Sequence, residues 1–108
     1  MSMNAIVFEA IALKKALVAT YNRQQAVFAP HILYTRHDEL YVDAVVLERE
    51  GQPPRETKLG TFKLTGLKDM ALAEGRTFAR QSVYDPSAAK YEGVTLFAIE
   101  APEQALAG

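Results

Sequence analysis

A chain of 108 residues has room for one hydrophobic core, and about two-thirds of its unfolded surface can be buried on folding. Hydrophobic residues make up 49% and charged residues 23%, a balance that excludes intrinsic disorder. The chain has no cysteine, which excludes thiol catalysis, disulfides, iron–sulfur clusters and thiolate zinc sites. With no apolar run of membrane-spanning length and no secretory pattern at its start, the sequence predicts a cytoplasmic protein.

The net charge of −1 hides an uneven distribution of charged residues. Residues 14–37 hold four cations and no carboxylate, residues 38–50 hold five carboxylates and one cation, and residues 55–68 hold four cations and one carboxylate. Two basic segments therefore flank an acidic one. This pattern allows a basic groove but does not indicate a globally basic nucleic-acid binder.

The first predicted element is a helix over residues 4–16, because apolar residues recur there at helical spacing. Asn4 is the expected N-cap. Lys14 and Lys15 are expected in the last turn, where cations suit the negative end of the helix dipole.

Short strands at close spacing are predicted for most of the remaining chain. Pro30 requires an edge position or a bulge in its strand, because proline cannot donate to a ladder. Gly60 suggests a bulge or a close backbone approach, and a short turn of helix is expected after Pro86. The predicted strands cover residues 17–21, 26–34, 40–48, 57–66, 67–73 and 93–101.

The strand over residues 40–48 carries the clearest alternation. Leu40 and Val42 are expected to point into the core, while Tyr41 and Asp43 share the opposite face. The carboxylates of residues 38–50 are interpreted as the solvated face of this strand and its flanking loops. We predict one core formed by Phe62, Leu64, Leu40, Val42 and Ile11, with the helix closing one end of a barrel.

One helix followed by five or six short strands predicts a mainly β fold in the form of a small barrel. We expect a single domain over residues 1–108. Its helix covers residues 4–16, its barrel residues 17–73, and a C-terminal extension with a late strand residues 74–101.

The sequence offers few groups for catalysis. His37, Asp38 and Glu39 could be drawn as metal ligands, but adjacent residues in a tight turn rarely converge on one ion. His31 follows Pro30 and is interpreted as a hydrogen-bonded packing residue. The usual nucleotide-binding, hydrolase and metalloprotease motifs are absent from the sequence. We therefore predict a protein that is not an enzyme, with no metal and no cofactor.

Tyrosines interleaved with cations offer a better case for binding, since a phenol ring can stack on a base and its hydroxyl can bond a phosphate. Tyr41 and Lys63 are both expected to face outward and to share a surface if their strands are neighbours. Lys58, Arg23 and Tyr21 are secondary candidates. For Tyr21, as for each tyrosine alone, the alternative is a half-buried barrel residue.

The order of short motifs resembles the WYL domain. EAIALKKALVATY (9–21) resembles its opening helix and strand, and VFAPHIL (27–33) its strand with a proline. DELYVDA (38–44) stands where the family has Trp-Tyr-Leu, with only Tyr41 literal. LGTFKLTGL (59–67) and MALAEGRTF (70–78) are similar to the strands that close that domain.

This resemblance implies a small Sm-like, SH3-type barrel behind an N-terminal helix. Members are mostly bacterial regulators of transcription in which this domain senses a ligand, often an anionic or nucleic-acid one. The family's three arginine positions on its basic strand correspond to Gly60, Lys63 and Gly66 here. One cation of the three is therefore present.

Two functions remain open. The first is a non-enzymatic, WYL-like module that binds an anionic ligand, such as single-stranded nucleic acid or a nucleotide, weakly and through Tyr41 and Lys63. It would act in a bacterial regulatory system, through a regulatory protein partner and not at a membrane. The alternative is a structural or protein-interaction barrel that forms homo-oligomers through edge strands and has lost the ligand pocket.

Overall fold

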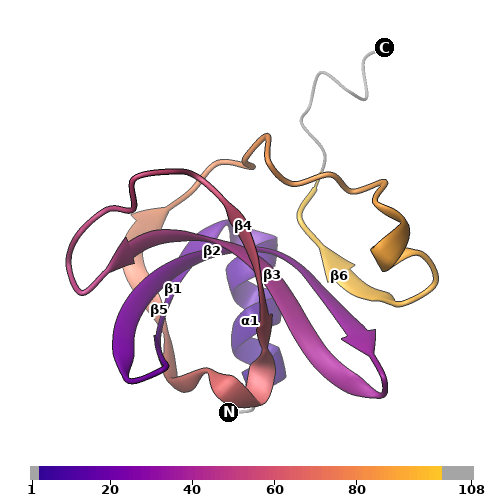
Figure 1. Cartoon of the computed structure of the whole chain (residues 1–108), viewed down its shortest axis with the longest axis horizontal. Helices are drawn as coiled ribbons and strands as arrows, with labels where there is room; N and C mark the ends of the chain where they lie inside the picture. Colours follow the sequence, from indigo (N-terminus) through magenta and orange to yellow (C-terminus); the bar gives the residue numbers. More distant parts are fainter. Residues whose placement is uncertain (1–2, 101–108) are drawn as a thin grey trace.

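A computed structural model describes residues 3–100 as one N-terminal helix and an antiparallel sheet of six strands (Figure 1). The elements are α1 (Met3–Leu13), β1 (Lys15–Tyr21), β2 (Gln24–Arg36), β3 (Glu39–Arg49), β4 (Leu59–Lys63), the 3-10 turn η1 (Leu64–Gly66), β5 (Lys68–Thr77), the 3-10 turn η2 (Ala89–Tyr91) and β6 (Thr95–Ala98). No helix within residues 3–100 is long and apolar enough to cross a membrane.

The helix is shorter than predicted and begins one residue earlier. Asn4 lies inside α1 and is therefore not its N-cap. Lys14 adopts φ 54°, a left-handed conformation that ends the helix, and Lys15 is already the first residue of β1. The two lysines are thus outside the last helical turn, because residues 15–21 pair as a strand with both β2 and β5.

The strands form one sheet in the order β4-β3-β2-β1-β5, with β6 also paired to β2. Two-residue turns with positive φ, at Asn22–Arg23 and His37–Asp38, connect β1 to β2 and β2 to β3. Within residues 3–100, β4 and β5 lie at the two ends of this order and do not pair. The prediction of a closed barrel is therefore wrong, while the mainly β fold with one N-terminal helix is confirmed.

The long strand β2 is the centre of the sheet. On one side it pairs with β3, and on the other side its first half pairs with β1 and its second half with β6. Pro30 falls between those two halves and beside a register shift in the β2–β3 ladder. The predicted bulge at Pro30 is confirmed, and its missing N–H is tolerated there.

One face of the sheet carries the predicted core. Phe62, Leu64, Val42 and Ile11 are buried in one cluster, and Leu40 packs against it. The Phe62 ring meets Phe28 edge-on, with 5.0 Å between ring centroids. The strand phase that places these residues inward is confirmed.

Gly60 pairs regularly with Ala44 and forms no bulge. A Cβ at position 60 would come within 2.9 Å of the Phe62 ring. The predicted close approach at Gly60 is therefore confirmed, but the group that lies close to Gly60 is the ring of Phe62 and not a backbone segment. An arginine at this position would have to displace a core side chain.

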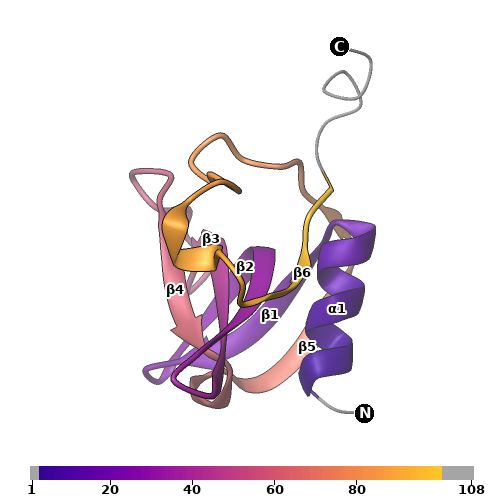
Figure 2. The same cartoon turned by 90° about the vertical axis from the view of Figure 1, so that its right-hand side faces the viewer.

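The C-terminal part covers the other side of the sheet. Figure 2 shows α1 on one side and η2 on the opposite side, with β6 between them. The strand β5 continues to Thr77, beyond the predicted end at residue 73, and β6 is shorter than the predicted 93–101, whose last residue lies outside the described part. The expected turn after Pro86 is present as η2. Residues 78–94 therefore do not extend away from the sheet but return across it.

Candidate functional site

The two principal candidates from the sequence lie side by side. Tyr41 pairs with Lys63 across β3 and β4, and it pairs with Tyr34 across β2 and β3. The rings of Tyr34 and Tyr41 stack with 6.2 Å between centroids and 26° between their planes. The prediction that Tyr41 and Lys63 share a surface if their strands are neighbours is confirmed.

Lys63 is not a free cation at this surface. Its Nζ lies 2.8 Å from the Glu39 carboxylate, and this hydrogen bond raises the pKa of Lys63. The two side chains are 42% and 48% exposed, so water competes with the pair. Exposed pairs of this kind are worth little and can exchange partners.

The secondary candidates have other surroundings. Tyr21 is half-buried and meets the Phe62 ring edge-on, with 5.1 Å between the ring centroids. This agrees with the alternative prediction for Tyr21, in which it is a half-buried residue of the sheet and not a ligand contact. Arg23 lies in the exposed β1–β2 turn. Lys58 lies in the loop before β4, exposed, with its Nζ 3.3 Å from Glu56. Of the five predicted residues, the register therefore pairs only Tyr41 and Lys63 directly.

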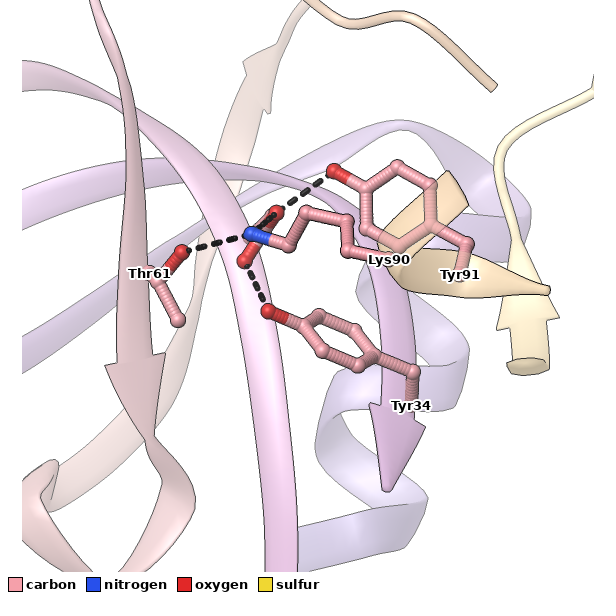
Figure 3. Close-up of polar contacts among 5 residues, drawn as sticks. Tyr34, Thr61, Lys90 and Tyr91 are labelled. Carbon is pink, nitrogen blue, oxygen red and sulfur yellow. Dashed lines mark hydrogen bonds and ion pairs between the residues drawn. The ribbon is translucent and has the colours of Figure 1, made fainter. Parts of the chain in front are cut away.

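A buried carboxylate network lies next to this pair (Figure 3). Asp43 on β3 has no exposed surface. Its Oδ1 accepts a hydrogen bond of 2.7 Å from the Tyr34 hydroxyl, and its Oδ2 accepts one of 2.5 Å from the Tyr91 hydroxyl. Lys90 Nζ lies 2.9 Å from the same Oδ2 and donates to the Thr61 hydroxyl at 3.1 Å.

The prediction that Asp43 belongs to a solvated face is wrong. Tyr91 and Lys90, from a segment almost fifty residues away in the sequence, cover this carboxylate. One feature of the sequence pointed to this burial and was missed. Asp43 stands in an apolar run, with Val42 before it and Ala44 and Val45 after it, so both faces of the strand carry buried apolar residues. A near-continuous apolar run is typical of a strand covered on both sides.

The network raises the pKa of three of its members, Tyr34, Tyr91 and Lys90. Burial and the bond to Asp43 raise the pKa of both Tyr34 and Tyr91, so their hydroxyls remain donors. Burial acts against the charged form of Lys90, but its interactions with Asp43 and Tyr34 outweigh burial, and its pKa is raised. These groups satisfy the carboxylate and hold η2 on the sheet; none is activated as a base or nucleophile.

A second contact from the same segment involves His31, which is fully buried. Its Nε2 accepts a hydrogen bond of 3.0 Å from the Gln81 backbone N–H, so its Nδ1 carries the proton that is donated to the Ala29 carbonyl at 2.8 Å. Burial lowers the pKa of His31, and the charge of Arg80 acts in the same direction. The prediction of a hydrogen-bonded packing histidine is confirmed.

His37 and Asp38 lie in the two-residue turn before β3, and Glu39 is the first residue of that strand. Among residues 3–100, no group of three or more histidine, aspartate or glutamate side chains is arranged to hold a metal ion. No family model, curated protein or solved structure matches the chain.

Proposed function

We propose that this chain is a non-catalytic binding domain for an anionic ligand, and that Tyr41 and Lys63 form its contact surface. The observation that carries the proposal is the register, which pairs a half-buried tyrosine ring directly with a part-exposed lysine on neighbouring strands. A ring and a cation at this spacing suit a base and its phosphate. The WYL-like motif order and the helix before the sheet support the same function.

The electrostatics of the surface also support the proposal. Asp43 shares a face with Tyr41 but is bound by Lys90 and two phenol hydroxyls, which offset its charge. The Lys63–Glu39 pair is exposed, so an anion can compete for the lysine. With glycine at positions 60 and 66, we expect few phosphate contacts and an affinity that is micromolar or weaker at physiological salt.

The test is fluorescence anisotropy with a labelled single-stranded oligonucleotide at two salt concentrations. The slope of log affinity against log salt should correspond to roughly one to three phosphate contacts. Lys63→Ala should reduce that slope by about one and weaken all sequences alike. Tyr41→Ala should weaken binding by about 1–3 kcal/mol with little change in slope, whereas Tyr41→Phe preserves stacking and removes the hydroxyl.

A matched control is Lys68→Ala, which removes an exposed cation from β5 at the opposite end of the strand order. It should leave both affinity and salt slope unchanged. A flat titration with folded wild-type protein at low salt would refute the nucleic-acid form of the proposal.

The free edges of β4 and β5 within residues 3–100 favour a second candidate, an interaction module that assembles through strand pairing. Leu96 on the short strand β6 adds an exposed apolar side chain, 47% accessible. This candidate predicts no oligonucleotide binding at low salt and a mass above that of one chain by light scattering. The two measurements together distinguish the candidates.

A further inference from the structure

A concave hollow of about 560 Å³ lies beside Tyr34 and is not lined by Tyr41. It is lined by Tyr34, Thr35, Arg36, His37, Lys90 and Val94. Arginine and lysine supply two cations. The described lining residues include no carboxylate, but Asp43 lies 2.9 Å from the Lys90 Nζ and offsets part of its charge, so Arg36 is the lining cation that most favours a negative charge here.

Arg36 is the cation most available to a ligand. It is exposed at the end of β2 and has no ion pair within residues 3–100. The residue opposite it on β3 is Glu39, whose carboxylate is bound by Lys63 at 2.8 Å. The two left-handed residues that follow, with φ of 52° and 65°, fix the turn that presents Arg36 and His37.

Lys90 lines the same hollow from η2 and is held in place before any ligand arrives. Asp43 and Thr61 bind its Nζ at 2.9 and 3.1 Å, and the rings of Tyr34 and Tyr91 each lie 5.4 Å from it. Its side chain nevertheless remains 42% exposed. Asp43, Thr61 and the Tyr34 hydroxyl are hydrogen-bond partners of this ammonium, so Lys90 acts on a ligand as a part-exposed positive charge and not through a free N–H. Because Lys90 is already ordered, little side-chain entropy is lost on binding.

We infer that this hollow is a binding site for a phosphomonoester group, with Arg36 and Lys90 as its cationic walls and His37 and the Thr35 hydroxyl as further hydrogen-bonding groups. A terminal phosphate carries up to two charges and three acceptor oxygens, which suits cations arriving from two sides. Arginine can contact two of those oxygens at once, and lysine acts as a point charge. A free phosphorylated metabolite and a phosphorylated strand end share this chemistry.

The experiment is a two-dimensional amide NMR titration of the full chain with inorganic phosphate near neutral pH, against sodium chloride of equal ionic strength. Phosphate, and not chloride, should shift the amides of residues 35–37 and 94 along a saturable curve with a millimolar midpoint. Arg36→Gln should weaken that binding about tenfold, as the loss of a charge-assisted hydrogen bond predicts. Arg36→Lys should have a smaller effect.

The matched control is Arg55→Gln, because Arg55 is an exposed arginine in the loop before β4 that does not line the hollow, and it should leave phosphate binding unchanged. Unsaturable shifts, equal shifts with chloride, or unchanged binding in Arg36→Gln would each overturn the site. A comparison of a 5′-phosphorylated with a 5′-hydroxyl oligonucleotide then distinguishes the two sources of the phosphate group. Tighter binding of the phosphorylated strand that requires Arg36 assigns the site to strand ends. Equal binding of the two strands assigns the site to free phosphomonoesters.

Lys63→Ala should leave phosphate binding in this hollow intact, because Lys63 does not line it. The hollow and the Tyr41–Lys63 surface can therefore be tested separately. Phosphate binding without oligonucleotide binding would refute the nucleic-acid form of the proposed function and leave this site standing, and the reverse result would refute this site alone.

Discussion

Replacement of Asp43 by asparagine tests the buried network most directly. The substitution preserves the size of the side chain but removes its charge and puts an NH₂ group where one acceptor oxygen was. In the native protein, this carboxylate accepts hydrogen bonds from Tyr34, Tyr91 and Lys90 while having no exposed surface. The asparagine amide could satisfy one phenol as before, but it could no longer pair with the ammonium.

The expected loss of stability follows from the number and exposure of these bonds. Each hydrogen bond to a charged group is worth about 1.5–3 kcal/mol. The Lys90 side chain is 42% exposed and can be rehydrated, which reduces the loss from its ion pair. We therefore expect Asp43→Asn to lower the unfolding free energy by about 2–4 kcal/mol. For a chain near 100 residues this corresponds to a fall in Tm of roughly 8–16 °C.

Urea denaturation followed by circular dichroism measures this change as a lower midpoint at constant slope. Asp69→Asn is a matched control, because Asp69 is exposed on β5 and asparagine tolerates its positive φ of 51°. That control should change stability by less than about 0.5 kcal/mol. A double-mutant cycle with Tyr91→Phe should show coupling of about 0.5–3 kcal/mol. An unchanged midpoint in Asp43→Asn would refute the role of the network in holding η2 on the sheet.

Two further predictions concern the core and the buried histidine. Phe62→Ala should cost roughly 3–5 kcal/mol, enough to unfold a domain of this size, and a cooperatively folding variant with unchanged Tm would show that the strand phase is wrong. The pKa of His31 is lowered by burial, so below about pH 6.5 the unfolded chain binds more protons and stability falls as the pH approaches the folded-state pKa. His31→Gln should flatten this part of the unfolding free energy plotted against pH, while His37→Gln should retain it; equal profiles would contradict the assignment.

Local alternation determined much of the sheet. The period of two in residues 40–46 and 62–64 gave the inward positions of Val42 and Phe62, because a one-residue change of phase would expose an entire apolar row. The same reasoning placed Tyr41 and Lys63 on one surface, and the chemistry of proline located the bulge at Pro30. These features depend on residues close in the sequence, or on a single pairing of neighbouring strands.

The tertiary structure decided how the second face of the sheet is covered. Alternation shows that Tyr41 and Asp43 share a face, but it does not show whether water or protein meets that face. Here residues 78–94 cross it and bring Lys90 and Tyr91 onto Asp43, so a carboxylate expected in solvent is fully buried. The open sheet has the same origin, because closure depends on whether its two outermost strands meet, which no local pattern specifies. Contacts between segments far apart in the sequence leave only a weak pattern in either segment. Such contacts need two surfaces of complementary shape and chemistry, and this need does not impose a regular spacing of residues.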